Sequence, residues 1–271
     1  MRAPRFVTLT TDIGWAYAAQ MKAVLARRAP NAIVVDIAHD IPPHGIREAA
    51  FLLGEVAPQF PRGTVHVVVV DPGVGGPRAA LGVETRDGSF LLGPDNGVLS
   101  GAVRSLGNRR SVRLDPRRFA PEIRTSPTFE GRDVFAPAAA VLATGGRLPR
   151  LGVRHPVAEL HLPRPRLRAD GVSGEVVHVD VFGNAITNVP GSRVPSGLAS
   201  VLFRTGRGRA RRLALVRTYG DADVGGLALL ISSFGLLELA ERNGSAAKRL
   251  RLAVGDPVEL VWDPPRGGAG K

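Results

Sequence analysis

The stretch VHVVVVDPGVGGPR, residues 65–78, places an acid and a guanidinium seven residues apart on a glycine-rich loop. An apolar run leads directly into Asp71, and Arg78 closes the loop. An arginine beside a carboxylate keeps that carboxylate ionised, and it can hold an anion or a water molecule through two parallel hydrogen bonds. The pattern therefore indicates either an acid–arginine pair that orients a reactant or a salt bridge that closes a turn.

The glycine spacing in this loop argues against a phosphate-binding loop. Gly73, Gly75 and Gly76 match neither G-x-G-x-x-G nor G-x-x-x-x-G-K-[ST], and no lysine follows them. An aspartate at the end of the strand would also repel a phosphate. A phosphate cradle is therefore not expected here.

Further polar residues fall at the ends of β-prone runs or in the adjoining loops. These residues are Asp12, Asp36, Asp71, Asp95 and Asn96. Each alone is more readily explained as a helix cap or a turn residue. In open α/β sheets, however, ligands bind beyond the carboxyl ends of the strands. Taken together, these residues predict a site at that edge, where Asp12 and Asp71 could meet.

The elements that would position these residues alternate along the first half of the chain. Apolar runs at 6–10, 32–37 and 65–70 are predicted strands, and the stretches 17–29 and 47–57 have helical composition. Alternation of strand and helix predicts a parallel sheet covered by helices. We therefore expect an α/β domain at the N-terminus, over residues 1–163.

The second half of the chain has a different pattern. Residues 160–167 are rich in proline and arginine without apolar periodicity, which indicates a linker. Short β-prone segments separated by turns follow, with one short helix expected near 236–243. These features predict a smaller all-β, barrel-like C-terminal domain over residues 170–265.

The composition limits the classes of partner. The net charge is +12, and arginine clusters at 164–168 and 207–212 could touch nucleic acid, but aromatic residues make up only 5% of the chain and none interleave with them. A solvated basic surface is the favoured interpretation, so nucleic acid is not expected. The chain has no cysteine, no apolar run long enough for a membrane helix and no signal-peptide core. We expect a cytoplasmic protein without a membrane partner.

Several longer motifs occur in order from Leu9 to about Val258. They are LTTDIG, MKAVL, VDIAHDIPP, VVVVDPGVG, GPDNGVLS, TFEGRDVFAPAAA, VDVFGNAITNV and FGLLELAERNGSAA. Together they are similar to the S-adenosyl-L-methionine hydroxide adenosyltransferase family, relatives of the adenosyl-fluorinating and chlorinating enzymes.

This resemblance implies a fold, an assembly and a reaction. The fold is an N-terminal α/β/α sandwich followed by a C-terminal β-barrel. The assembly is a homotrimer, with S-adenosylmethionine bound between the N-terminal domain of one subunit and the C-terminal domain of its neighbour. In the reaction, water or hydroxide attacks the adenosyl C5′ and gives adenosine and methionine. Because S-adenosylmethionine is the substrate, no separate cofactor and no metal is expected.

The resemblance also assigns residues. Asp71 and Arg78 match the family's acid and arginine, Glu130 occupies the third catalytic position, and Asp12 matches the acid that grips the ribose hydroxyls. Residues expected to contact the adenosine and methionine parts lie in the C-terminal domain: Asp180, Phe182, Asn184, Ser233, Phe234, Glu238 and Asn243. Plainer interpretations remain open for several of them, as core aromatics, a turn asparagine or a glutamate on a polar helix face.

The sequence departs from the family pattern in two places. Glu130 stands where the family has a histidine, and the first loop is two residues shorter, with Trp15 in place of an acid. A glutamate can accept a proton or pair with Arg78, but the exchange could also leave a protein that binds S-adenosylmethionine or adenosine without turnover.

A halide-using enzyme is the third alternative. That branch carries a tyrosine and a threonine where Asp71 and Val74 stand here, and it has an added loop that this chain lacks. A carboxylate beside the reacting carbon would repel a halide, so halide use is not expected.

Overall fold

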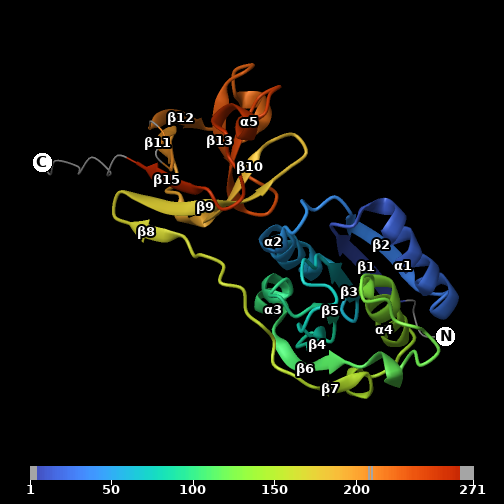
Figure 1. Cartoon of the computed structure of the whole chain (residues 1–271). Helices are drawn as coiled ribbons and strands as arrows, with labels where there is room; N and C mark the ends of the chain where they lie inside the picture. Colours follow the sequence, from blue (N-terminus) through green and yellow to red (C-terminus); the bar gives the residue numbers. More distant parts are fainter. Residues whose placement is uncertain (1–4, 207, 209, 263–271) are drawn as a thin grey trace, which may run out of the picture. The chain divides into compact units, whose positions relative to one another are not determined.

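The computed structural model describes residues 5–206, 208 and 210–262. The chain forms two compact units, Met1–His161 and Leu162–Lys271 (Figure 1). The last residues of the predicted second domain, 263–265, lie outside the described part of the chain. Within that part, no helix combines the length and the apolar character needed to cross a membrane.

A mixed sheet forms the centre of the N-terminal unit. Its order is β2-β1-β3-β5-β4-β6-β7 (Figure 1). Its strands are β1 (Phe6–Thr11), β2 (Ile33–Ala38), β3 (Val65–Val69), β4 (Ala80–Thr85), β5 (Phe90–Pro94), β6 (Asn108–Leu114) and β7 (Gly152–Arg154). The pairs β1–β2, β1–β3 and β3–β5 are parallel, so the carboxyl ends of these strands share one edge.

The prediction of a parallel sheet is wrong for half of this sheet. Strand β4 pairs antiparallel with both β5 and β6, and β6 pairs antiparallel with β7. Only four residues, 86–89, connect β4 to β5, and Gly88 adopts a φ of +90° there. A connection this short can join only antiparallel strands. The sequence of β4, ALGVET, lacks a continuous apolar run and therefore was not predicted as a strand.

Helices cover both faces of this sheet. Helices α1 (Gly14–Arg28) and α4 (Ala136–Ala143) contact each other, as do α2 (Ile46–Val56) and α3 (Ser100–Leu106). Met21 of α1 shares one core with Val67 of β3, whereas Leu53 of α2 shares another with Val68. Successive strand residues point to opposite faces, so the continuous apolar run of β3 is buried on both sides. The expected α/β/α sandwich is confirmed.

The C-terminal unit is a barrel. Its strands are β8 (Arg166–Arg168), β9 (Gly171–Val179), β10 (Ala185–Pro190), β11 (Ser200–Thr205), β12 (Arg211–Leu215), β13 (Leu227–Ile231), β14 (Leu236–Glu241) and β15 (Pro257–Val261). In the order β10-β14-β13-β12-β11-β15-β9-β8, β9 also pairs with β10. Among the described residues this pairing closes a ring of seven strands, with β8 outside it. The expected barrel-like, all-β fold is confirmed.

The helix predicted near 236–243 is wrong. This segment is strand β14, and the short helix α5 (Ala246–Leu250) lies farther along, with Ser245 accepting a hydrogen bond from the Lys248 N–H at 3.2 Å. LLELAE contains good helix formers, but Leu237 and Leu239 alternate into the barrel core. Tertiary burial with a period of two outweighs helix propensity here.

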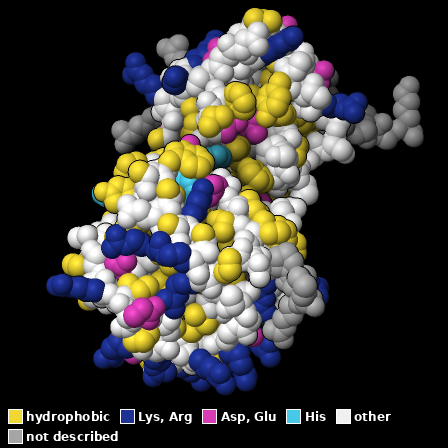
Figure 2. Space-filling model, turned by 90° about the vertical axis from the view of Figure 1, so that its right-hand side faces the viewer, with side chains coloured by type: hydrophobic (Ala, Val, Ile, Leu, Met, Phe, Trp, Pro, Cys, Tyr) yellow, Lys and Arg dark blue, Asp and Glu magenta, His cyan; other side chains and the backbone are white. Residues whose placement is uncertain are grey.

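The basic surface is mixed rather than uniform. On the face shown in Figure 2, lysine and arginine side chains are spread out, with acidic side chains among them. In the first arginine cluster, Arg168 pairs with Glu259, which Arg204 also approaches at 3.7 Å. Residues 207 and 209 of the second cluster lie outside the described residues.

Candidate active site

The loop after β3 folds back so that its arginine grips its acid. The Arg78 Nε donates to Asp71 Oδ1 at 3.0 Å, and its Nη2 donates to Oδ2. The Asp71 side chain is only 5% exposed. The two parallel hydrogen bonds fix the carboxylate plane against the guanidinium plane. The ion pair that both interpretations of this loop predict is therefore present, and it closes the loop in a geometry that can orient a reactant.

A second carboxylate joins the same arginine from a distant part of the chain. Arg78 Nη1 donates to Glu130 Oε2 at 2.6 Å. Burial lowers the pKa of Arg78, but its hydrogen bonds to Asp71 and Glu130 outweigh that effect and raise it. The guanidinium therefore stays charged between two acids. We call Asp71, Arg78 and Glu130 the carboxylate–arginine cluster.

The local backbone explains how Glu130 reaches this place. It directly precedes a π-helical turn, Gly131–Phe135, that runs into α4. A Cβ on Gly131 would lie 3.1 Å from the Phe129 ring and 3.2 Å from the Met21 sulfur. The turn is therefore packed tightly against the core, and single π-helical turns of this kind are frequent at functional sites.

The two segments that carry the cluster touch each other directly. Gly75 adopts a φ of +76°, and a Cβ there would lie 2.5 Å from the Pro127 carbonyl oxygen. Glycine is needed at this point for its conformation and for the close approach. The acid–glycine loop and the segment before Glu130 are thus packed backbone to backbone.

Asp12 lies at the same sheet edge, one strand away. Its N–H donates to the Val69 carbonyl at 3.3 Å, and its Oδ2 accepts from the His44 N–H at 3.0 Å. His44 adopts a φ of +68°, an uncommon conformation for a residue other than glycine. At the end of β3, Asn96 Nδ2 donates to the Val70 carbonyl at 2.9 Å. The edge therefore gathers Asp12, Asp71 and Asn96.

Two other acids predicted for this edge have structural partners. Asp36 lies inside β2, where Lys22 Nζ donates to it at 2.5 Å and His39 Nε2 approaches at 3.0 Å. Asp95 accepts from the Ala158 N–H at 2.7 Å and lies 3.1 Å from His155 Nε2. Both carboxylates stabilise neighbouring segments.

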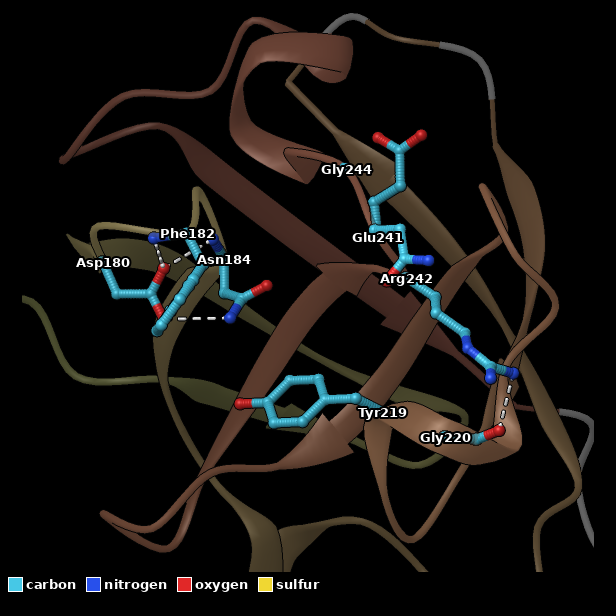
Figure 3. Close-up of a pocket in the computed structure, with 9 residues that line it drawn as sticks. Asp180, Phe182, Asn184, Tyr219, Gly220, Glu241, Arg242 and Gly244 are labelled. Carbon is cyan, nitrogen blue, oxygen red and sulfur yellow. Dashed lines mark hydrogen bonds between the residues drawn. The ribbon is translucent and has the colours of Figure 1, made fainter.

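The C-terminal unit contains a pocket of about 610 Å³, which we call the barrel pocket. Its lining residues are Asp180, Phe182, Asn184, Tyr219, Gly220, Glu241, Arg242, Asn243 and Gly244. Asp180 accepts from the Phe182 and Asn184 N–H groups at 2.9 and 2.8 Å, and from Asn184 Nδ2 at 2.9 Å. Figure 3 shows the Tyr219 hydroxyl pointing toward the side that carries Asp180 and Asn184, with Arg242 on the other side.

A buried acid lies behind this pocket. Tyr219 donates its hydroxyl to Glu238 Oε1 at 2.7 Å, and Glu238 is 2% exposed. Burial raises the pKa of Glu238, and the charge of Asp180 adds to this effect, although the Tyr219 hydrogen bond opposes it. Among the described residues, neither Asp180 nor Glu238 pairs with a lysine or arginine. This side of the pocket therefore carries negative charge that suits a cation.

Two family models together span most of the chain. The SAM hydroxide adenosyltransferase N-terminal domain matches residues 7–152, and the SAM hydroxide adenosyltransferase C-terminal domain matches residues 174–259. The chain belongs to the SAM hydroxide adenosyltransferase family.

Individual proteins resemble the chain over nearly their whole length. A Thermus thermophilus protein named (R)-S-adenosyl-L-methionine hydrolase is 42% identical over 90% of this chain and 94% of its own. A Salinispora arenicola protein of the same name is 39% identical over 96% and 99% of the two chains. The crystal structure of an uncharacterized conserved protein from Thermotoga maritima matches with a TM-score of 0.88 and 35% identity, covering 94% of this chain and 99% of that one.

The residues expected from the family pattern fall into two groups. The structure joins Asp71, Arg78 and Glu130 in the N-terminal unit, and it places Asp180, Phe182, Asn184 and Asn243 in the barrel pocket. Ser233 and Phe234 lie in the turn before β14 and do not line the barrel pocket, whereas Asn243, which follows that strand, does. Their binding role stays a prediction.

Sequence reasoning missed Tyr219, Glu241 and Arg242 as pocket residues. Tyr219 begins a 3₁₀ turn, Tyr219–Asp221. A signal for this turn was present, because Thr218 and Asp221 form a capping box. Glu241 and Arg242 carry no such signal in the family motif to which they belong.

Proposed function

We propose that this protein hydrolyses S-adenosyl-L-methionine to adenosine and L-methionine. The oxygen of a water molecule bonds to the adenosyl C5′ while the C5′–sulfur bond breaks. Its electron pair stays on sulfur, which changes from a sulfonium to the neutral thioether of methionine. One proton of the water is released to a carboxylate and then to solvent. The reaction balances without a redox partner, and the proposal includes no cofactor or metal.

The carboxylate–arginine cluster is the observation that carries this proposal. A neutral thioether leaves without protonation, so the chemical difficulty lies in the weak nucleophile. Arg78 holds Asp71 and Glu130 on either side of one guanidinium. Of the three side chains, Glu130 is the most exposed, at 21%, against 12% for Arg78 and 5% for Asp71. Two fixed carboxylates can orient a water molecule and accept its proton, a contribution of about 10²–10⁴ in rate.

The remaining residues are proposed to hold the substrate. Asp12 offers two acceptor oxygens to the ribose hydroxyls, and Asn184 offers both a donor and an acceptor to the adenine edge. The uncompensated charge of Asp180 and Glu238 suits a substrate that carries an ammonium and a sulfonium. Ser233, Phe234 and Asn243 complete the proposed binding set through the family pattern.

We also propose a homotrimeric cytoplasmic enzyme whose active site combines residues of two subunits. Exposed large apolar side chains close in sequence to the proposed binding residues support an assembly. Val181 and Phe182, next to Asp180, are 87% and 74% exposed, and Trp15, three residues after Asp12, is 65% exposed. Isolated exposed apolar residues are ordinary, but here they accompany the functional residues. A cytoplasmic location is in keeping with a chain that has no cysteine.

Incubation with S-adenosylmethionine in oxygen-18 water tests the reaction. We expect adenosine that carries the label in its 5′-hydroxyl, together with unlabelled methionine. Tight binding without product would instead support a binding protein without turnover, the alternative that Glu130 motivates. Formation of a 5′-halogenated nucleoside in chloride buffer would support halide use, against which Asp71 argues.

Mixing two impaired variants tests the shared site. A Glu130→Ala variant lacks a cluster residue, and an Asp180→Ala variant lacks a pocket residue. If the site combines two subunits, unfolding and refolding the variants together restores part of the activity, because mixed trimers contain some intact sites. A verified mixed trimer that is no more active than the two variants alone would contradict the shared site.

A further inference from the structure

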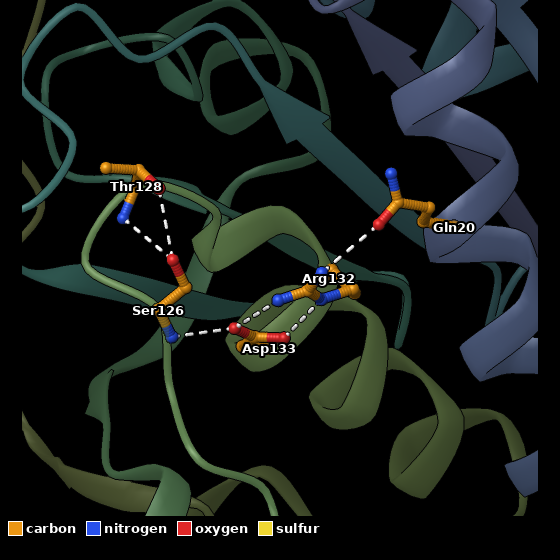
Figure 4. Close-up of polar contacts among 5 residues, drawn as sticks. All are labelled: Gln20, Ser126, Thr128, Arg132 and Asp133. Carbon is orange, nitrogen blue, oxygen red and sulfur yellow. Dashed lines mark hydrogen bonds and ion pairs between the residues drawn. The ribbon is translucent and has the colours of Figure 1, made fainter.

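Asp133 is a buried acid beside the cluster that the proposed reaction does not use. It is 3% exposed and lies within the π-helical turn, three residues after Glu130. Its carboxylate accepts from the Ser126 N–H at 2.7 Å and from Arg132 Nε and Nη2 at 2.6 and 3.0 Å (Figure 4). We call this buried carboxylate with three donors an anchor, because removing it would leave those donors without a hydrogen-bond acceptor.

The anchor holds the segment that leads into Glu130. Ser126 begins this segment, and its hydroxyl contacts that of Thr128 at 3.0 Å (Figure 4). At the other end, the Asp133 N–H donates to the Phe129 carbonyl at 3.2 Å, and the Arg132 guanidinium lies 5.2 Å from the centre of the Phe129 ring. Segment 126–129 is therefore tied at both ends to the π-helical turn.

Helix α1 supports the same arrangement. Arg132 Nη1 donates to Gln20 Oε1 at 3.1 Å, which ties the π-helical turn to α1 (Figure 4). On the opposite side of the segment, the Pro127 carbonyl abuts Gly75 of the acid–glycine loop. Segment 126–129 therefore lies between the Asp133 anchor and the loop that carries Asp71 and Arg78.

Glu130 depends on this anchor more than Asp71 does. Among the described residues, the carboxylate of Glu130 has one hydrogen-bond partner, Arg78, and is the most exposed of the cluster. Asp71 is held by two hydrogen bonds on its own loop. A small shift of segment 126–129 would therefore remove Glu130 from Arg78 and leave the Asp71 pair in place.

We propose that Asp133 is a positioning residue for the hydrolysis, which holds segment 126–129 so that Glu130 meets Arg78. The inference rests on the proposed function, because it assigns Asp133 an effect on the water rather than on the substrate. Substrate contacts lie elsewhere, at Asp12 and in the barrel pocket. The effect on kcat should therefore exceed the effect on KM.

The test compares Asp133→Ala with Asp133→Asn. Asparagine keeps an acceptor for the Ser126 N–H but breaks the bidentate arginine pair, so it should retain part of the function. We expect Asp133→Ala to lower kcat at least tenfold with KM within twofold, and Asp133→Asn to fall between it and the wild type. If Asp133→Ala does not fold, Arg132→Ala takes its place, since that side chain is 37% exposed and its removal frees the same carboxylate.

Asp115→Ala is the matched control. Asp115 accepts from the N–H, Nε and Nη2 of Arg117 at 3.2, 2.9 and 3.0 Å, so it also holds one backbone N–H and one bidentate arginine. It should leave kcat within twofold. Unchanged kcat in Asp133→Asn and in Asp133→Ala (or its replacement Arg132→Ala) would overturn the inference. An equal loss of kcat in Asp115→Ala would also overturn it.

Crystal structures of the variants decide the inference independently of turnover. In Asp133→Ala, or in Arg132→Ala if the former is insoluble, we expect Glu130 to leave Arg78 while Asp71 stays paired. A structure that keeps Glu130 on Arg78 would overturn the inference even if activity fell. Conversely, absent turnover in the wild type would refute the proposed function without touching this structural result.

Discussion

The carboxylate–arginine cluster and the barrel pocket both contain acidic side chains, but these side chains have different partners. In the cluster, Asp71 and Glu130 share the single charge of Arg78, so each carboxylate has a cationic partner within the chain. In the barrel pocket, Asp180 and Glu238 receive only amide and hydroxyl donors from the described residues. The acids of the cluster are ion-paired, whereas Asp180 and Glu238 have no lysine or arginine partner among the described residues. This difference suggests that the first set acts in the reaction and the second in binding.

The largest test of this comparison removes the shared arginine. Arg78→Ala leaves two carboxylates close together without a cation, and it removes the group that orients both. We expect kcat to fall by about 10³-fold, within the range of positioned acid–base groups. Steady-state kinetics measure this, with Arg110→Ala, an exposed partner of Glu84, as the control. A loss of less than tenfold would mean that the ion pairs of Arg78 stabilise the fold and do not contribute to the reaction.

A smaller loss is expected when one carboxylate is removed. Glu130→Ala should lower kcat by about 10²-fold, because Asp71 remains paired and still faces the water. The dissociation constant for S-adenosylmethionine, measured by calorimetry, should change less than threefold. Unchanged turnover would remove Glu130 from the mechanism. Glu130→His, which restores the residue expected from the family pattern, shows whether glutamate and histidine are interchangeable here.

In the barrel pocket the effect should move from kcat to KM. Glu238→Gln keeps the shape and removes a buried charge behind the pocket that is proposed to attract the cation, so we expect KM to rise about tenfold with kcat unchanged. Glu241→Gln is the matched control, because Glu241 lines the same pocket but already pairs with Arg249 at 2.9 Å. Equal effects of the two variants would contradict the proposed role of uncompensated charge.

The smallest effect concerns pH. Burial raises the pKa of Glu238, so this acid loses its charge at a higher pH than an ordinary glutamate, and KM should rise as the pH falls. The Tyr219 hydrogen bond opposes that shift, and Tyr219 stays protonated because burial and Glu238 raise its own pKa. Tyr219→Phe should therefore move the rise in KM to higher pH, by less than about one unit. A KM profile that does not move would separate Tyr219 from the ionisation of Glu238.

Much of the fold could be predicted from local patterns, and the failures have physical causes. The run from Val65 to Val70 is apolar on both faces, so its buried central position was predictable. Strand β4 was not, because its antiparallel pairing depends on a short turn rather than on its own composition. Segment 236–243 failed because its residues favour a helix while the barrel buries every second one.

The site was predictable where the residues lie close in sequence. Asp71 and Arg78 are seven residues apart, so their pairing follows from one loop. Glu130 is 52 residues from Arg78, and only the family pattern brought it to the same place. Asp133 accepts from the Ser126 N–H seven residues before it, and Tyr219 donates to Glu238, 19 residues after it. No local pattern reports such contacts.

The contact between Gly75 and Pro127 has an evolutionary consequence. A single methyl group at position 75 would collide with the carbonyl of residue 127, so neither segment can drift alone. Most substitutions at position 75 can therefore be accepted in evolution only after the segment around residue 127 has changed. The two segments should inherit their lengths and shapes as one unit, and a mutational scan of one should depend on the history of the other.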